Sequence, residues 1–217
     1  MIIFFGLHSQ NFLGQLDQTV ELLGDYVNLY QVHSATFDSG ILSDRRAHEA
    51  LSQCKKTRGW SIGLSLSGPT QNDILREAMK IEAPDGSRLF DSVQCTYNLL
   101  EQRPSDALLE AHEAGMDIII KEGMANGRLF QSEKIKEIAS STGYSIDQIA
   151  LASILCQPFN GRVLSGAVTE EQLISNMKAL ELTKTLKNEK ALLEQIMESC
   201  CMNSEKYWED RSALAWN

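Results

Sequence analysis

Short apolar runs alternate with longer amphipathic stretches along most of the chain. The short runs favour β-strands because they hold consecutive aliphatic and β-branched residues between polar or glycine-containing segments. The longer stretches place apolar side chains three or four positions apart, which is the spacing of one helical face. We therefore predict strands over 2–7, 26–32, 61–66, 92–96, 117–121 and 162–164, and helices over 16–23, 44–54, 71–79, 106–113, 131–140 and 170–182.

Helix boundary signals agree with this alternation. Ser105 precedes an apolar run, and both 145–148 and 169–172 match a capping box, while Gly24 and Gly115 stand where helices should end. Strands that alternate with helices predict parallel pairing through right-handed crossovers. We expect the α/β class, as a parallel (β/α) barrel of TIM type that is incomplete, with about six of its eight βα units.

Two further expectations concern burial and domain layout. Strand interiors are apolar at consecutive positions, as in 118–120, which predicts strands covered by apolar groups on both faces. After Leu182 the alternation stops, and we expect one helix over 185–208 that packs over an end of the sheet. We predict a single domain over 1–217, with βα units in 1–182 and a C-terminal helical tail in 183–217.

Composition and charge exclude several classes of function. The chain is 43% hydrophobic and 23% charged, so it holds enough apolar residues for a sizeable core. Its net charge of −9 disfavours nucleic acid and anionic membrane surfaces as partners. The apolar start lacks the length and basic flank of an export signal, so we expect a cytoplasmic protein. The five cysteines lack metal-ligand spacing and indicate reduced thiols without a metal site, with one of Cys200 and Cys201 buried and the other exposed.

Polar or glycine-containing segments follow the predicted strands. Because the carboxyl ends of parallel strands form the functional rim of α/β proteins, these segments are candidates for a site. Hydroxyl, amide and imidazole groups along such a rim suit an elongated ligand that lies across a barrel mouth. The segments are 30–34, 63–67, 93–98, 121–127 and 163–167.

Blocks of sequence in a fixed order carry a resemblance to a known family. They are 24–33, 62–65, 93–94 with 97–100, 124–129, and 164–167 with Asn176. With these blocks the chain resembles the C-terminal three-quarters of an aldo/keto reductase, from about the third strand of that family to its end. The resemblance implies a barrel that uses NADP or NAD as cofactor and acts on a small-molecule carbonyl or its alcohol.

The resemblance also implies roles for individual residues. His33 is expected to orient and polarise the substrate carbonyl at the barrel mouth. Ser65 and Gln94 are expected to hydrogen-bond the carboxamide of the nicotinamide. The remaining residues implied by the resemblance meet the adenosine and phosphate portion of the cofactor, and they are Ser165, Gly166, Thr169, Gln172 and Asn176, the last near the adenine.

Several of these residues have a second interpretation that needs no ligand. A histidine at a strand end, such as His33, often bonds its neighbours. Gln94 equally suits a polar group bonded inside the barrel mouth. Thr169 and Gln172 complete a capping box by themselves, although the helix N-terminus that they cap also suits a phosphate.

Departures from the family pattern point to reduced activity. In the family, a tyrosine supported by a lysine and an aspartate protonates the carbonyl oxygen. The chain starts at about the family's third strand, so the tyrosine and aspartate have no counterpart, and 2–8 holds no lysine. Because removing a positioned acid costs about 10²–10⁴ in rate, we expect a truncated or weakly active reductase. The alternative is a non-catalytic interaction or cofactor-binding module that pairs with another chain, or with a second copy, through open sheet edges.

Smaller departures affect the cofactor. Leu66 replaces the asparagine that usually follows the serine of the fifth strand, and 121–123 stands where the family commonly has a stacking aromatic residue. The loop 167–172 offers two carboxylates, Glu170 and Glu171, and no basic residue. Because a ribose 2′-phosphate is normally bound by arginine or lysine, this loop disfavours a phosphorylated dinucleotide.

Overall fold

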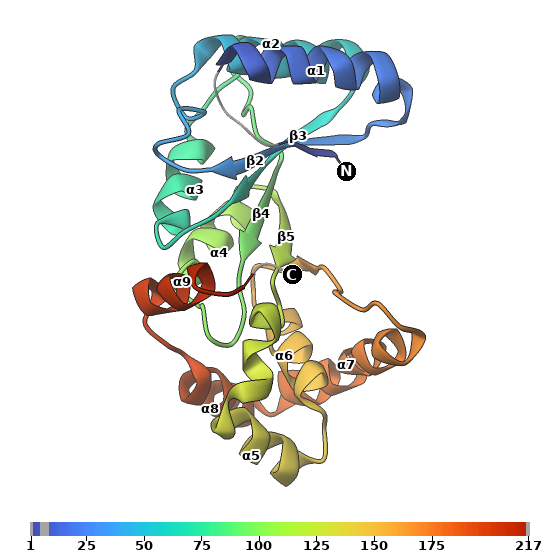
Figure 1. Cartoon of the computed structure of the whole chain (residues 1–217), viewed down its shortest axis with the longest axis vertical. Helices are drawn as coiled ribbons and strands as arrows, with labels where there is room; N and C mark the ends of the chain where they lie inside the picture. Colours follow the sequence, from blue (N-terminus) through green and yellow to red (C-terminus); the bar gives the residue numbers. More distant parts are fainter. Residues whose placement is uncertain (1, 5–8, 216–217) are drawn as a thin grey trace. The chain divides into compact units, whose positions relative to one another are not determined.

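The computed structural model describes residues 2–4 and 9–215 of the chain, and its side chains from Phe12 onward (Figure 1). The chain forms two compact units, which we call unit 1 and unit 2. Unit 1 contains residues 1–95 and 107–118, and unit 2 contains residues 96–106 and 119–217. The single domain predicted over the whole chain stays a prediction.

The strands confirm the predicted α/β class. In unit 1, β1 pairs with β2, β2 with β3 and β3 with β4, and in unit 2 β5 pairs with β6, all of them parallel and in chain order. The third, fourth and fifth strands have the predicted bounds, whereas the sixth ends at Val163, one residue before the predicted end. The second strand runs from Leu29 to Ala35 because 24–26 forms a short 3₁₀ helix, and 5–8 of the predicted first strand lies outside the described residues. The strands are β1 (Ile2–Phe4), β2 (Leu29–Ala35), β3 (Ser61–Leu66), β4 (Ser92–Thr96), β5 (Asp117–Lys121) and β6 (Arg162–Val163).

The helices follow the amphipathic stretches. The capping box at 145–148 is present as predicted and begins a helix that the periodicity alone did not mark. The α-helices are α1 (Ser9–Leu23), α2 (Arg45–Arg58), α3 (Gln71–Met79), α4 (Ser105–Glu113), α5 (Glu133–Thr142), α6 (Ile146–Leu155), α7 (Glu170–Asn188), α8 (Lys190–Cys200) and α9 (Ser204–Ser212). Two 3₁₀ helices are η1 (Gly24–Tyr26) and η2 (Ala125–Gln131).

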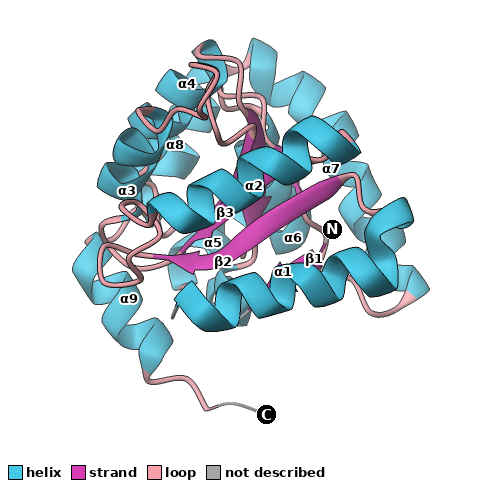
Figure 2. Ribbon diagram, turned by 90° about the horizontal axis from the view of Figure 1, so that it is seen from above, coloured by secondary structure: helices cyan, strands magenta, loops and turns pink. Residues whose placement is uncertain are grey.

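The core of unit 1 forms where helices cover one face of its strands. In Figure 1 and Figure 2, α1 and α2 lie side by side along β2 and β3. Tyr30 of β2 stacks on Trp60 with ring centroids 5.9 Å apart, and Phe12 of α1 meets Tyr30 edge to face at 6.3 Å. These three buried rings fix the helix layer against the sheet.

The opposite face of β2, β3 and β4 is polar, which corrects the prediction of apolar groups on both faces. Parallel register aligns Gln31 with Gly63, Gly63 with Ser92, and Ser65 with Gln94. All four polar side chains are buried. Because side chains alternate between faces along a strand, these residues share the face that points away from Tyr30. The prediction holds for β5, whose consecutive isoleucines 118–120 are all buried.

The C-terminal tail is helical, but the prediction of one helix over 185–208 was wrong. Helix α7 continues to Asn188, where Glu189 leaves the helical conformation, and a second break precedes α9. The Asn203 side chain accepts a hydrogen bond from Lys206 N at 3.0 Å and so begins α9. The tail packs mainly on other helices of unit 2 and on the loop after β4, through residues such as Ile196 and Tyr207, rather than over an end of the sheet.

Three further observations concern the described residues. No helix among them combines the length and apolarity that crossing a membrane requires. Within the same residues, no group of three or more His, Cys, Asp or Glu side chains is arranged to hold a metal ion. Cys200 is buried and Cys201 is exposed, which confirms the predicted division of this pair.

A buried carboxylate connects the tail with the loop after β4. Glu101 is fully buried, and its Oε2 accepts a hydrogen bond from the Ser204 hydroxyl at 2.6 Å. The backbone N–H of Arg103 donates to Oε1 at 3.1 Å. Burial nevertheless dominates, and it raises the pKa of Glu101 above that of an ordinary glutamate.

Glu101 is therefore expected to make stability depend on pH. In Glu101→Gln, the stability lost relative to the parent should be largest below about pH 4.3, the unfolded pKa of glutamate, and should shrink as pH rises through the folded pKa. The reason is that the folded state holds this proton more tightly than the unfolded state. Urea unfolding from pH 4 to pH 8 measures the difference.

Glu205→Gln is the matched control, because its hydrogen bonds lower the pKa of Glu205. Its stabilising contribution is fully present above about pH 4.3 and is lost only as pH falls below that value, so the parent-minus-variant difference should not shrink between pH 5 and pH 8. A Glu101→Gln difference that likewise does not shrink with rising pH would contradict the assignment.

Candidate functional site

Strand β2 carries a bulge at the predicted catalytic histidine. The register with β3 shifts between Val32 and Ala35, so His33 and Ser34 together lie opposite Ser65. Ser34 has φ of 51°, in the left-handed region that non-glycine residues rarely adopt. Bulges of this kind re-aim a side chain next to functional sites. The Ser34 hydroxyl lies 2.8 Å from His33 Nδ1, so a neighbour fixes the ring, as the second interpretation of His33 requires.

Ser65 and Gln94 form a polar pair on neighbouring strands. The Ser65 hydroxyl donates to Gln94 Oε1 at 3.1 Å, and both side chains are buried. Both residues share the polar face of β2, β3 and β4. His33 lies opposite Ser65 at the bulge of β2, so unit 1 carries an imidazole, a hydroxyl and an amide at neighbouring positions of three adjacent strands.

Sequence reasoning included Gln31 in the candidate segment 30–34 but gave it no role of its own. The Gln31 side chain is fully buried, and neither its Oε1 nor its Nε2 bonds any described residue. The available signal was a period of two, because Gln31 and His33 in β2 match Ser92 and Gln94 in β4. The apolar neighbours of each polar residue concealed that alternation.

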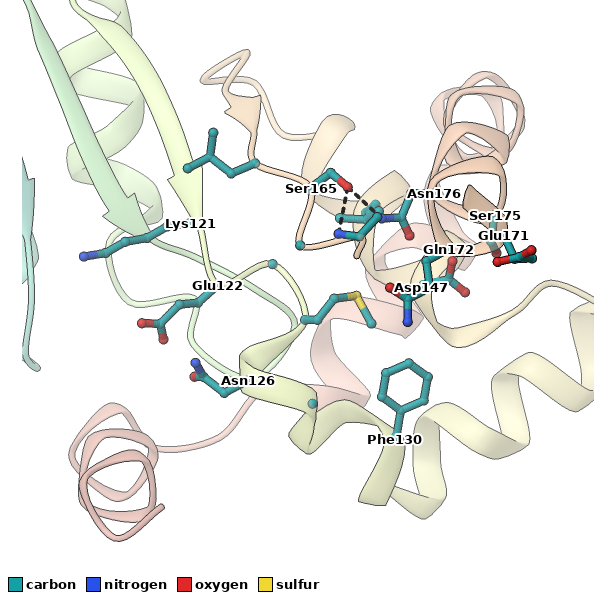
Figure 3. Close-up of a pocket in the computed structure, with 17 residues that line it drawn as sticks. Lys121, Glu122, Asn126, Phe130, Asp147, Ser165, Glu171, Gln172, Ser175 and Asn176 are labelled. Atoms are coloured by element: carbon teal, nitrogen blue, oxygen red, sulfur yellow. Dashed lines mark hydrogen bonds between the residues drawn. The ribbon is translucent and has the colours of Figure 1, made fainter. Parts of the chain in front are cut away.

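Unit 2 contains a pocket of about 710 Å³ (Figure 3). Its walls come from the loop after β5, η2, the first turn of α6, the segment 164–167 after β6, and the first turns of α7. Ser165, Gly166, Gln172 and Asn176 line it, so unit 2 brings together four of the five residues expected at the adenosine portion of a cofactor.

Hydrogen bonds fix the segment after β6 onto α7. Asn176 Nδ2 donates to the Ser165 hydroxyl oxygen at 2.9 Å, and the same oxygen accepts a hydrogen bond from Ala167 N at 3.2 Å (Figure 3). The turn at Gly166 is thus attached to the helix that forms the opposite wall. This preserves the shape of the pocket without help from a ligand.

Thr169, the fifth residue, acts as a helix cap and is not among the residues lining the pocket. Its hydroxyl oxygen accepts a hydrogen bond from Gln172 N at 3.3 Å. Gln172 Oε1 accepts a hydrogen bond from Val168 N at 2.9 Å rather than from the backbone N–H of the cap residue Thr169. Capping therefore explains the described bonds of Thr169, and its contact with a cofactor stays a prediction.

Other residues of the pocket were missed as site residues. Phe130 exposes 51% of its surface, and in Figure 3 its side chain points toward Gln172 and Asp147. Asp147 lies within the capping box of α6, and this local role gave no reason to assign it to a binding site. Glu171 was recognised as a loop carboxylate, and the structure places it in the pocket wall. Its own backbone N–H and the Thr169 hydroxyl lower the pKa of Glu171, so the side chain stays ionised.

A cluster from the tail supports the β5 side of the pocket. Arg211 of α9 donates from Nε to both Glu122 oxygens at 2.9 and 3.0 Å, and the Glu122 side chain is only 12% exposed. The Tyr207 hydroxyl donates to Glu122 Oε2 at 3.3 Å and accepts from Asn98 Nδ2 at 3.0 Å. We call Glu122, Arg211, Tyr207 and Asn98 the tail clamp. It attaches α9 to the loop that forms one pocket wall.

A sequence model of the aldo/keto reductase family matches residues 5–198. The chain belongs to the aldo/keto reductase family. It is 25% identical over 191 residues to YqkF, an uncharacterized oxidoreductase of Bacillus subtilis strain 168, and the match covers 76% of this chain and 58% of that relative. The chain thus spans less than two thirds of this curated relative.

Solved aldo-keto reductases share the fold. The structure superposes with a TM-score of 0.67 on a holo aldo-keto reductase from Bacillus halodurans, at 18% identity, over 94% of this chain and 72% of that one. The TM-score is 0.63 with an aldo-keto reductase enzyme from a Medee basin deep-sea metagenome library, at 20% identity, over 94% of this chain and 70% of that one. These likenesses confirm the predicted barrel-type α/β fold.

In this aldo/keto reductase the predicted residues fall into two groups. His33, Ser65 and Gln94 belong to unit 1, and the pocket residues such as Ser165 and Asn176 belong to unit 2. Their roles toward substrate and cofactor stay predictions.

Proposed function

We propose that this aldo/keto reductase chain binds a nicotinamide dinucleotide and serves a reaction that interconverts a small-molecule carbonyl and its alcohol. The observation that carries the proposal is the unit 2 pocket, which holds Ser165, Gly166, Gln172 and Asn176 in its wall. Membership of a family whose enzymes typically use NAD(P)H supports it. We also propose a cytoplasmic location, because cysteines without metal-ligand spacing suit a reducing compartment.

The pocket fits the adenosine portion of such a cofactor. Its volume of about 710 Å³ lies within the range of small-molecule sites. Phe130 and Leu164 offer apolar surface for a flat base, while Gln172 and Asn176 offer amides for hydrogen bonds. The first turn of α7 adds backbone N–H groups and the positive end of a helix dipole near the same wall.

The polar face of unit 1 fits the reacting end. Ser65 and Gln94 supply a hydroxyl and an amide, the groups that hydrogen-bond a carboxamide. When bound, the reduced nicotinamide supplies a hydride to the carbonyl carbon. His33, re-aimed by the bulge in β2, then donates a hydrogen bond to the carbonyl oxygen and stabilises the negative charge that develops there.

We further propose that proton transfer to the carbonyl oxygen limits the rate of reduction, so that turnover by this chain alone is weak. The described polar side chains on the face of β2, β3 and β4 are amides and hydroxyls of serine and threonine, with His33 beside them at the bulge, and include no tyrosine. Tyr30 lies on the other face, stacked on Trp60. Hydride transfer without a positioned acid loses about 10²–10⁴ in rate.

Cofactor titration of the full chain tests the proposal. Quenching of intrinsic fluorescence by NADH should saturate, and Asn176→Ala should weaken binding about tenfold, the equivalent of one lost hydrogen bond of 1.4 kcal/mol. Asn188→Ala, at the other end of α7, is the matched control and should leave affinity unchanged. An assay over a panel of aldehydes should show rates well below those usual for enzymes.

Absence of saturable binding of either reduced dinucleotide would refute the proposed function. If the parent and Asn176→Ala bind the cofactor with equal affinity, the cofactor does not bind in the unit 2 pocket. Turnover of about 1 s⁻¹ or more, abolished by His33→Ala, would contradict the proposed limit on proton transfer.

A second candidate function is pairing with another chain. Helix α7 buries Ala179, Leu182 and Leu186 on one face. It also exposes large apolar side chains, each about half accessible, which are Leu173, Ile174, Met177 and Leu180. An exposed apolar stripe of this kind favours association, either with a second copy or with a different protein. Sedimentation of the full chain over a range of concentrations separates a monomer from a homo-oligomer.

A further inference from the structure

The charged side chains that line the unit 2 pocket are mostly acidic. Among the lining residues, Glu122, Asp147 and Glu171 are carboxylates and Lys121 is the cation. Arg211 neutralises Glu122 through an ion pair at 2.5 Å. In Figure 3, Lys121 and Glu122 lie on the β5 side, whereas Asp147 and Glu171 lie toward α7. The α7 side of the pocket therefore carries uncompensated negative charge.

Neither carboxylate on the α7 side is neutralised by a described residue. Asp147 accepts a hydrogen bond from the Ser145 hydroxyl at 2.5 Å, which leaves its charge in place. Glu171 lies in the first turn of α7, and hydrogen bonds lower its pKa so that it is ionised at neutral pH. Gln148 Nε2 donates to the Ser175 hydroxyl oxygen at 3.2 Å and ties α6 to α7. The two carboxylates thus stand on elements that are bonded to each other.

This charge distribution discriminates between the two forms of the cofactor. A ribose 2′-phosphate carries between one and two negative charges and normally needs arginine or lysine beside it. A ribose 2′-hydroxyl is neutral, and a carboxylate accepts a hydrogen bond from it. The α7 side of the pocket offers the carboxylates that suit the hydroxyl and lacks the cation that suits the phosphate.

We propose that the unit 2 pocket selects an adenine dinucleotide whose ribose carries a free 2′-hydroxyl, and that Glu171 is the residue that sets this preference. The inference rests on the proposed function, because it assigns the adenosine portion of the cofactor to this pocket. It goes beyond that function by selecting NAD(H) over NADP(H). Glu171 acts both by repelling the phosphate and by accepting the hydrogen bond of the hydroxyl.

Fluorescence titrations of the full chain with NADH and with NADPH test the proposal. The parent should bind NADH about tenfold more tightly than NADPH, a difference of 1.4 kcal/mol. Glu171→Gln should bring the two dissociation constants to within about threefold of each other, and Glu171→Arg should reverse the preference. Circular dichroism confirms that each variant retains the parent's helix content.

Glu170→Arg is the matched control. Glu170 is the neighbouring residue in the same first turn of α7, is exposed, and is not among the residues lining the pocket. It makes the same change in net charge at the same helix end as Glu171→Arg. The ratio of the NADPH and NADH dissociation constants should therefore stay within about threefold of the parent's ratio.

Different outcomes separate this proposal from the function on which it rests. If NADPH binds as tightly as NADH or more tightly, the preference is refuted while the dinucleotide-binding function stands. If Glu170→Arg shifts the ratio as much as Glu171→Arg, general charge and not Glu171 sets the preference, and the assignment to Glu171 fails. If neither dinucleotide binds, both the function and this inference are wrong.

Discussion

Replacing Tyr207 by alanine is expected to lower the free energy of unfolding by about 3–5 kcal/mol, as for other large aromatic side chains in a core. Tyr207 is fully buried and packs edge to face on Trp208 with ring centroids 5.5 Å apart. The Arg128 guanidinium lies 4.0 Å from its ring centroid. The substitution removes this packing and also breaks part of the tail clamp, so the Glu122 carboxylate keeps Arg211 while the Glu122 backbone carbonyl keeps its hydrogen bond from Asn98 Nδ2.

Chemical unfolding followed by tryptophan fluorescence measures this loss, with Trp208 as a reporter beside the substitution. Tyr207→Phe is the control, because it keeps the ring and removes only the hydroxyl. It should cost about 1–2 kcal/mol, since Asn98 Nδ2 and Glu122 each lose one hydrogen bond. A Tyr207→Phe loss equal to that of Tyr207→Ala would show that the clamp, rather than packing of the ring, dominates.

Replacing Gly63 by alanine is expected to destabilise the chain by about 1–3 kcal/mol, the cost of overpacking a filled interior. A Cβ atom at this position would lie 2.3 Å from the Ser92 hydroxyl oxygen and 3.1 Å from both the Ser92 carbonyl oxygen and Gln31 Cγ. The Ser92 hydroxyl must rotate away, and because the Ser92 carbonyl oxygen belongs to the backbone of β4, the two strands must also separate slightly. That shift should reach the Ser65 and Gln94 pair two residues further along.

A second substitution makes this prediction sharper. Gly63→Ala combined with Ser92→Gly removes the closest clash and should recover part of the stability, while the 3.1 Å approach to the Ser92 carbonyl oxygen remains. Gly14→Ala in α1 is the control, because a Cβ there meets nothing within 4 Å. It should be neutral or stabilise by up to about 1 kcal/mol. The interpretation fails if Gly63→Ala unfolds at the same urea concentration as the parent.

Local patterns predicted the elements well because their causes are local. The strands over 61–66, 92–96 and 117–121 and the helix over 71–79 occur with the predicted bounds. In each case the apolar period and the flanking polar residues lie within one short segment. The tail was the exception, because an unbroken helical composition over 185–208 does not reveal the turns at Glu189 and before α9.

The candidate site was only partly predictable, because several of its contacts join segments that are far apart in the sequence. Family resemblance found Ser65 and Gln94, which the structure joins by a hydrogen bond. It did not find Glu122 with Arg211, because those partners are 89 positions apart and neither belongs to a recognisable motif. Asp147 was also missed, because its place in a helix cap already accounted for an aspartate at that position. Contacts between distant segments leave no periodic trace in the sequence.

The tail clamp also affects the order in which the pocket is completed during synthesis. Arg211 follows Glu122 by 89 residues. At a translation rate of about 5–20 residues per second, Arg211 is added roughly 4–18 s after Glu122. Until then the Glu122 carboxylate lacks its cationic partner, and the loop after β5 packs on α6 without its contacts to α9. A nascent chain paused before α9 therefore contains the residues of the pocket without the α9 contacts on one wall.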